Sequence, residues 1–212
     1  MSNLTNRVKL SPSFWMHDSA VPLSSDLLPG SLFAKNKDFL VVDVETKTLV
    51  DAVGGWKNFK QLEISVACAY DSATGEMHSY LEKDLPKLNA LCRERLVIGY
   101  NILGFDLPVM EKYGLEIAGL DTFDLMFDIQ NVSGWRFLKL EKVATATLGV
   151  GKSADGLQAV EWWKEGKVDQ IIEYCKKDVE VTRDVFLYGL NKGHVKIEKA
   201  DGTQAEFKVN WS

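Results

Sequence analysis

The sequence predicts an α/β protein in which helices flank a mixed central sheet and a β-hairpin follows at the C-terminal end. Three observations lead to this fold class. Three strand-like segments come first, separated by turn-rich stretches, which is typical of an antiparallel meander. Helix-like and strand-like segments then alternate, which indicates further strands joined by helices. Two alternating runs around an Asp-Gly pair near the end predict the hairpin.

The three strands of the predicted meander span 38–46, 62–70 and 77–82. The first contains the apolar run FLVV, which is typical of a central strand that is buried on both faces. A turn with the sequence DSATGE separates the second strand from the third. We therefore expect the first strand near the centre of the sheet.

The segments that follow the meander switch between two periodicities. Residues 84–95 carry leucines at helical spacing, and 96–101 (LVIGYN) return to a strand pattern. Residues 106–114 predict a helix with a proline in its first turn, where proline is tolerated. This order predicts strand, helix, strand and helix around one sheet.

The second half of the chain is mainly helical by pattern. An apolar stretch at 120–129 is too short to assign. Helices are predicted at 137–149, 157–165 and 168–190, and the hairpin at 195–211.

These elements divide the 212 residues into three regions. Residues 1–36 carry three prolines and little periodicity, so they are predicted to be an irregular N-terminal extension. Residues 37–191 are predicted to form the α/β domain, and 192–212 the C-terminal hairpin. A chain of this length can bury one substantial core.

Composition and cysteine spacing exclude several classes of protein. Hydrophobic residues make up 46% of the chain, but no run approaches the ~18 apolar residues of a membrane span, and the N-terminus lacks the apolar region of a secretory signal. We therefore expect a cytoplasmic protein without a membrane partner. Cys68, Cys92 and Cys175 are odd in number and follow no CxxC pattern, so we expect reduced, buried thiols.

The formal net charge of -5 lowers the expectation of nucleic-acid binding, because phosphate contacts are usually built from clustered Lys and Arg. A site that binds cations contributes several of these negative charges itself, and bound cations offset them. The charge therefore leaves nucleic-acid binding open.

Asp43 and Glu45 in LVVDVET lie two residues apart on a predicted strand, so both side chains point to one face. Burying carboxylates beside an apolar run is costly. Mg²⁺ and Mn²⁺ offset this cost because they bind carboxylate oxygens. Two solvated residues near a strand end are the plain alternative for so short a motif, and the apolar run argues against it.

Asp106 in GYNILGFDLP follows a predicted strand and begins a predicted helix. Taken alone, it is best explained as a helix N-cap. The same position can place Asp106 at the rim of the sheet near Asp43, with Asn101 as a polar donor and Phe105 as a stacking surface.

Tyr174 and Asp178 in EYCKKDVEV are one turn apart on a predicted helix and share a face. A phenol in this place can orient a water while the carboxylate binds a metal ion. Taken alone, the helix favours core packing for Tyr174 and a surface charge for Asp178. Glu173 stands where a histidine would have suggested a histidine base.

Together the three motifs resemble the DEDD exonuclease superfamily of RNase H-like fold, in its tyrosine-bearing subclass. GYNILGFDLP and YCKKD are similar to the second and third exonuclease motifs of family B DNA polymerase proofreading domains, and DVET is similar to the first. The similarity covers about 38–190, the size of one domain. It implies an RNase H-like mixed sheet and a stand-alone exonuclease or an exonuclease module.

The resemblance also implies roles for individual residues. Two divalent ions, Mg²⁺ or Mn²⁺, would be bound by four carboxylates, and a tyrosine would orient the attacking water. Three further residues would hold the terminal nucleotide. The carboxylates are Asp43, Glu45, Asp106 and Asp178, the tyrosine is Tyr174, and the nucleotide contacts are Thr46, Asn101 and Phe105.

The favoured hypothesis is a metal-dependent 3′-5′ exonuclease that releases nucleoside monophosphates from single-stranded or frayed DNA ends. An exoribonuclease on RNA 3′ ends and a non-catalytic binding or scaffold module are the alternatives. A polymerase, a helicase or a repair protein is a candidate partner. The sequence contains no identifiable reader of the 2′-hydroxyl group that would decide between DNA and RNA.

Three sets of residues are weaker candidates for a role at the site. Asp124 is a candidate for support of a metal ligand, with a capping or surface role at least as well favoured. Three tryptophans are candidates for stacking on bases, with core or partner-facing packing as the plainer explanation. Five lysines are candidates for a basic track along the nucleic-acid strand, with a solvated helix face as the plainer explanation. They are Trp135, Trp162 and Trp163, and Lys139, Lys142, Lys152, Lys176 and Lys177.

Overall fold

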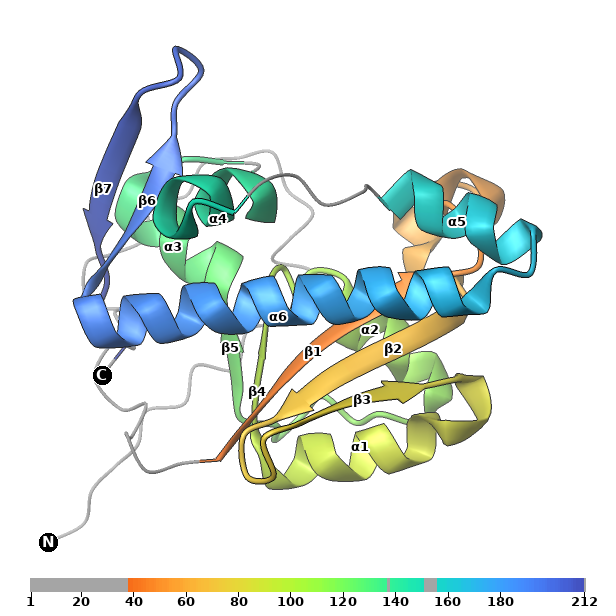
Figure 1. The fold of residues 1–212 in the computed structure, drawn as a ribbon. Coiled ribbons are helices and arrows are strands. Elements are labelled where there is room, and N and C mark those ends of the chain that lie inside the picture. The colour runs from red at the N-terminus through yellow and green to blue at the C-terminus, as the bar shows by residue number, and fades with distance from the viewer. Residues whose placement is uncertain (1–37, 137, 151–155, 212) are drawn as a thin grey trace, which may run out of the picture.

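The structure is a computed structural model that describes residues 38–136, 138–150 and 156–211. A five-stranded sheet lies at its centre, and one long helix crosses the sheet (Figure 1). The predicted extension at 1–36 lies outside the described residues. None of the described helices is long and apolar enough to cross a membrane.

The sheet is mixed, with the strand order β3-β2-β1-β4-β5. β1 pairs antiparallel with β2 and β2 pairs antiparallel with β3, whereas β4 and β5 continue the sheet in parallel on the other side of β1. This arrangement confirms the predicted meander and the central place of the first strand. The strands are β1 (Phe39–Thr46), β2 (Ile64–Asp71), β3 (Glu76–Tyr80), β4 (Leu96–Gly99) and β5 (Thr122–Asp124).

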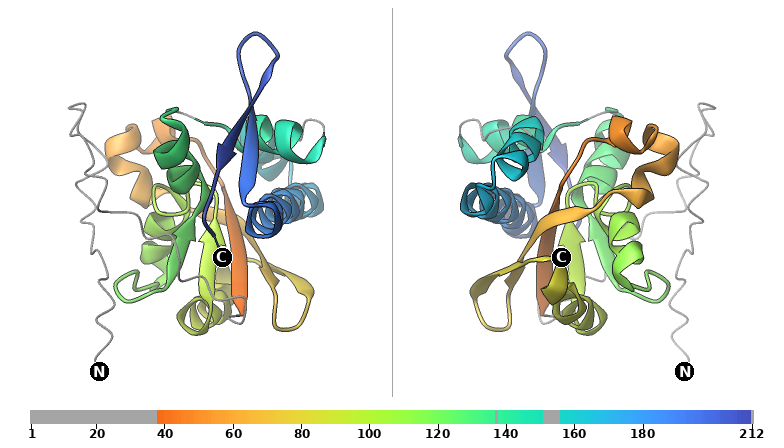
Figure 2. Two further views of the ribbon diagram at one scale, coloured as in Figure 1. Left: turned by 90° about the vertical axis from the view of Figure 1, so that its left-hand side faces the viewer. Right: turned by 90° about the vertical axis from the view of Figure 1, so that its right-hand side faces the viewer.

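The described helices cover both faces of the sheet (Figure 2). The α-helices are α1 (Leu85–Glu94), α2 (Asp106–Met110), α3 (Leu125–Ser133), α4 (Leu140–Leu148), α5 (Gly156–Lys164) and α6 (Val168–Lys192). The short 3₁₀ helices are η2 (Val50–Val53), η3 (Trp56–Gln61), η4 (Glu82–Asp84) and η5 (Glu111–Tyr113).

Alternation along β1 separates two hydrophobic cores. Val41 faces α6 and packs in one core with Cys175 and Val179 of that helix. Val42 and Val44 face the opposite way and pack in the second core, which includes buried residues of α1 and α2. Because successive strand residues alternate between faces, the odd-numbered positions of β1 lie on the α6 side.

Two segments differ from the prediction. The stretch that gave no clear element forms β5 and then α3, because Asp124 ends the strand and accepts a hydrogen bond from the Phe127 amide as the N-cap of α3. The segment between β1 and β2 contains η2 and η3. Short helices of this kind have no long apolar periodicity, so the pattern of the sequence did not reveal them.

The C-terminal hairpin is confirmed as β6 (His194–Glu198) and β7 (Gln204–Lys208), which pair antiparallel. The segment after it is tied to the main body. The buried Trp211 donates a hydrogen bond from Nε1 to Asp128 at 2.6 Å and packs on Gly189 of α6. A Cβ at Gly189 would lie 2.1 Å from the Trp211 ring, so only glycine allows this contact.

Candidate active site

Asp43 and Glu45 lie on the α6 face of β1, near the end of the strand. Glu45 is 9% exposed, and Asp43 is half-buried. The backbone determines this arrangement, because residues two apart on a strand share a face. The prediction that the two carboxylates point the same way is consistent with the structure.

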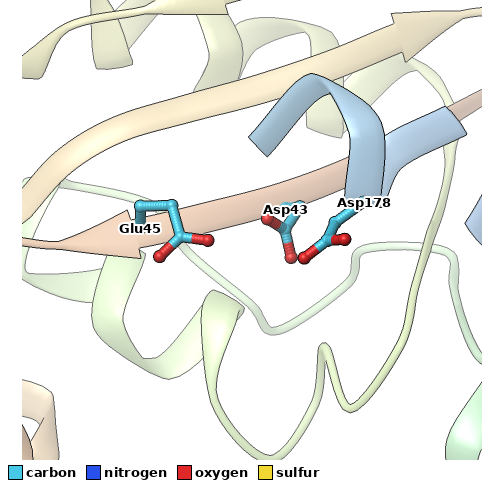
Figure 3. A group of neighbouring side chains, drawn as sticks. All are labelled: Asp43, Glu45 and Asp178. Atoms are coloured by element: carbon cyan, nitrogen blue, oxygen red, sulfur yellow. The ribbon is translucent and has the colours of Figure 1, made fainter. Parts of the chain in front are cut away.

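Asp178 reaches the same place from α6. One ligand oxygen of each of Asp43, Glu45 and Asp178 can be chosen so that all three atoms lie within 4.8 Å of one another. The Asp43 and Asp178 carboxylates face each other, and Glu45 lies farther along β1 (Figure 3). We call these three residues the carboxylate cluster. β1 and α6 are more than 120 residues apart in sequence, and their packing brings the cluster together.

Asp106 occupies the first position of α2 and is buried. Its Oδ1 accepts a hydrogen bond from the Val44 amide at 3.0 Å. β1 pairs with β4 only as far as Val41, so the Val44 amide lies beyond the end of the β4 ladder and takes a carboxylate as its acceptor. Asp106 is therefore fixed against β1 and is not an N-cap, since Phe105 holds that position.

The carboxylates strongly affect one another's protonation. Burial raises the pKa of Asp43 well above its ordinary value, and the charges of Asp106, Glu45 and Asp178 raise it further. Burial and the charges of Asp178 and Asp106 likewise raise the pKa of Glu45. Burial raises the pKa of Asp106 to about 8, although its hydrogen bond from Val44 acts in the opposite direction. Several acidic groups thus share one poorly solvated place.

Divalent cations fit this donor set. The cluster offers only carboxylate oxygens, which Mg²⁺ and Mn²⁺ prefer. Raised carboxyl pKa values show that full ionisation is unfavourable without an opposite charge. A bound cation supplies that charge, so Asp43, Glu45 and Asp178 are the residues that would bind it. Asp106 as a fourth ligand remains a prediction.

Tyr174 lies one turn before Asp178 on α6, and the charge of the Asp178 carboxylate acts on its hydroxyl. Burial and the charges of Asp178 and Glu45 raise the pKa of Tyr174 above its ordinary value. The phenol therefore keeps its proton at neutral pH. Trp162 of α5 packs edge-on against the Tyr174 ring with a centroid distance of 6.2 Å, which restricts the ring's position.

Cys175 is a feature of the site that the sequence pattern did not reveal. Its Sγ lies 3.4 Å from both the backbone oxygen and Oδ2 of Asp43, and its side chain is fully buried. The prediction that the three cysteines are buried and not in disulfides is confirmed. Cys175 is more than core filling, because its thiol is a hydrogen-bond donor to Asp43. Its place directly after Tyr174 in the third motif was the available signal.

The loop between β4 and α2 is held by Asp124. This buried carboxylate accepts hydrogen bonds from the amides of Asn101, Leu103 and Phe127, at 3.0, 3.0 and 3.1 Å. Asn101 has a φ of 64°, in the left-handed region that asparagine tolerates better than most residues. Asp124 thus has the capping role considered for it and also holds the conformation of the second motif.

The remaining predicted nucleotide contacts lie around the same end of the sheet. Thr46, the last residue of β1, donates a hydrogen bond from Oγ1 to the Thr48 carbonyl at 2.8 Å. Phe105 is half-buried and stacks on Phe59 with a centroid distance of 5.9 Å. Their roles in substrate binding remain predictions.

Of the three tryptophans considered for base stacking, two lie near the site and one packs elsewhere. Trp162 contacts Tyr174, and the Lys47 ammonium lies 5.3 Å from the Trp163 ring centroid, so both residues of α5 are near the site. Trp135 packs instead on Phe207 of the hairpin. Trp135 therefore has the packing role that was its plainer explanation.

The proposed lysine track is weakened by ion pairing. Lys142 pairs with Glu198 across to the hairpin. Lys176 and Lys177 pair with glutamates three residues away on α6. Surface pairs of this kind contribute little to stability, but they are typical of a solvated helix face. Lys152 lies outside the described residues.

A sequence model of the RNase H superfamily matches residues 40–188, which include all three residues of the carboxylate cluster. The chain belongs to the RNase H superfamily. No curated protein sequence matches it.

A search of solved structures places this RNase H superfamily chain beside a family B DNA polymerase from the hyperthermophilic archaeon Pyrobaculum calidifontis. The two are 16% identical, with a TM-score of 0.52. The match covers 74% of this chain and 26% of the polymerase. At this level of identity the similarity shows the fold, and the chain corresponds to about a quarter of the polymerase.

The superfamily and the carboxylate cluster together support a nuclease-type activity for this RNase H superfamily chain. Membership alone would not suffice, because function depends on the site and not on the fold. Here the acidic cluster lies within the matched region, on β1 and α6.

Proposed function

We propose that the chain is a metal-dependent 3′-5′ exonuclease that hydrolyses phosphodiester bonds at single-stranded or frayed DNA 3′ ends and releases nucleoside monophosphates. The observation that carries this proposal is the convergence of Asp43, Glu45 and Asp178 within 4.8 Å, with Tyr174 one helical turn from Asp178 on α6. This set combines metal-binding oxygens with a protonated phenol in one place.

Asp43, Glu45 and Asp178 would bind the divalent cations, with Asp106 as the predicted fourth ligand. The cations, two by resemblance, would activate water and stabilise negative charge at the phosphate during hydrolysis. Two hydrogen bonds hold carboxylate oxygens in position before substrate arrives. The Val44 amide donates to Asp106, and the Cys175 thiol donates to Asp43. Such preorganisation avoids the cost of rearrangement during the reaction.

Tyr174 is proposed to orient the attacking water. The lone pairs of its phenol oxygen can accept a hydrogen bond from a water. The raised pKa keeps the proton on the phenol at neutral pH, which suits a positioning role and not that of a base.

The 3′-5′ direction and the choice of DNA follow from the motif resemblance, and the polymerase neighbour is in keeping with DNA. Thr46, Asn101 and Phe105 are proposed to contact the terminal nucleotide. We also propose that residues 37–191 form the catalytic unit, to which 1–36 and 192–212 add a substrate path or a partner surface for a polymerase, helicase or repair protein.

The test is to incubate the purified chain with single-stranded DNA and RNA oligonucleotides that carry a label at either the 3′ or the 5′ end. The reactions contain Mn²⁺, Mg²⁺ or EDTA. The proposal predicts a ladder of shortened 5′-labelled DNA, immediate release of the 3′ label as a mononucleotide, and no reaction in EDTA. Faster degradation of RNA than of matched DNA would replace the proposal with an exoribonuclease. The absence of cleavage with both metals would favour a binding module.

A further inference from the structure

Trp56 on η3 is an unusually exposed tryptophan. Its side chain is 63% exposed, the highest value among the large exposed hydrophobic residues of the described chain. Tryptophan is highly buried on average, and exposed aromatic surface often marks a place where a partner binds. The residue therefore calls for an explanation beyond core packing.

Trp56 belongs to a group of three aromatic side chains from two separate segments. Phe59, also on η3, is buried and stacks on Phe105 with an interplanar angle of 17°. The Trp56 ring centroid lies 6.3 Å from that of Phe59 and 6.2 Å from that of Phe105, both within the range of aromatic contacts. Trp56, Phe59 and Phe105 form what we call the aromatic surface.

The aromatic surface adjoins the carboxylate cluster. Phe105 directly precedes Asp106, whose carboxylate is bonded to the amide of Val44, the residue between Asp43 and Glu45. η3 follows β1 after η2, so the chain runs from the carboxylates on β1 to the segment that carries Trp56 and Phe59. The rings are therefore linked to the cluster through Asp106, which directly follows Phe105 and whose charge acts on Asp43.

We propose that the aromatic surface binds one nucleobase of the unpaired strand by stacking, with Trp56 as the exposed ring. The inference rests on the proposed nuclease, since it names how that site holds its substrate. Stacking suits this surface because the exposed Trp56 and the half-buried Phe105 offer neutral aromatic area, with Phe59 packed beneath them, and every base has a face that can stack. The contact recognises the base and not the sugar, so it serves DNA and RNA alike.

The first experiment measures kcat and KM in Mn²⁺ for the wild type, Trp56→Ala and Trp56→Phe. Val132→Ala, which alters another exposed apolar residue on α3, is the matched control. Each protein is given oligonucleotides with normal bases and oligonucleotides with one abasic nucleotide at each of the last three positions. Circular dichroism and thermal unfolding confirm that the variants are folded.

Stacking is worth about 1–3 kcal/mol per base, or roughly 5- to 150-fold in affinity. We expect Trp56→Ala to raise KM by about 10-fold on the normal substrate, with Trp56→Phe and Val132→Ala within about 3-fold of the wild type. At one position an abasic nucleotide should raise the KM of the wild type and leave Trp56→Ala unchanged. If Trp56→Ala and the wild type respond equally to every abasic substrate, the inference is wrong and the nuclease proposal stands.

The second experiment is independent of cleavage. Tryptophan fluorescence is titrated with oligothymidylate in EDTA and in Ca²⁺, and we expect quenching in the wild type that is lost in Trp56→Phe. This quenching in a protein that cleaves nothing would support the base site while the nuclease proposal fails. Neither cleavage nor quenching dependent on Trp56 would overturn both.

Discussion

The Asp106 carboxylate accepts a hydrogen bond at 3.0 Å from the amide of Val44, 62 residues earlier in the chain. Val44 lies between Asp43 and Glu45, so this bond ties the second acidic motif to the backbone of the first. The carboxylate serves as a backbone partner beyond the end of β4 and as a negative charge beside Asp43. These two roles of Asp106 can be separated by mutation.

Asp106→Ala should lower stability, whereas Asp106→Asn should not. Alanine leaves the buried Val44 amide without its acceptor, which costs about 1–3 kcal/mol of unfolding free energy. Asparagine keeps the Oδ1 acceptor and cannot ionise, so it avoids the cost of a buried carboxylate charge. In EDTA we expect urea unfolding to show Asp106→Ala less stable than the wild type and Asp106→Asn at least as stable. Equal destabilisation by both substitutions would contradict the role of the hydrogen bond.

The protonation of Asp106 predicts a pH dependence of stability in EDTA. Its pKa is raised from 3.8 to about 8, so between about pH 4 and pH 8 the folded chain holds a proton that the unfolded chain has released. Stability from this group is therefore lost as the pH rises through that window. Relative to Asp106→Asn, the unfolding free energy of the wild type should fall by up to about 1.4 kcal/mol per pH unit. Unfolding curves at pH 5, 6, 7 and 8 measure the difference, and parallel profiles would refute it.

Cys175 should tune the metal site through Asp43. Cys175→Ser keeps a donor near Asp43 Oδ2, whereas Cys175→Ala removes it. Loss of a group that orients a metal ligand typically costs about 10- to 100-fold in metal affinity. Calorimetric titration with Mn²⁺ should show weakened binding in Cys175→Ala and affinity closer to the wild type in Cys175→Ser. Cys92→Ala, another buried thiol that lies in the opposite core, is the control and should bind Mn²⁺ normally.

Asp124 should matter for the fold of the second motif. Its carboxylate accepts three backbone hydrogen bonds, so Asp124→Ala leaves three amides without this acceptor. We expect a loss of at least about 3 kcal/mol of unfolding free energy, since each unsatisfied buried group costs about 1–3 kcal/mol. Hydrogen exchange should increase at Asn101 and Leu103 as well as at the start of α3. Exchange that changes only within α3 would show that Asp124 is a helix cap and nothing more.

Much of the fold and of the carboxylate cluster followed from local pattern. Asp43 and Glu45 share a face because a strand alternates, and Tyr174 and Asp178 share a face because a helix repeats nearly every four residues. The bond between Asp106 and Val44, the contact of Cys175 with Asp43 and the three hydrogen bonds of Asp124 depend on distant segments that meet only in the folded chain. Periodicity does not contain that information. The packing of Trp56 and Phe59 against Phe105 was not predicted for the same reason, because η3 and Phe105 meet only in the folded chain.

The most direct measurement is the initial rate of nucleotide release from single-stranded DNA in Mn²⁺ by the wild type, Asp178→Asn and Asp184→Asn. Asp184 is on the same helix but pairs with Arg183, so its substitution is a matched control. With all three proteins shown to be folded, we predict that Asp178→Asn loses at least about 100-fold in rate, because the carboxylate binds the catalytic ions, and that Asp184→Asn keeps the wild-type rate. A wild-type rate in folded Asp178→Asn would contradict the assignment of the carboxylate cluster as the active site.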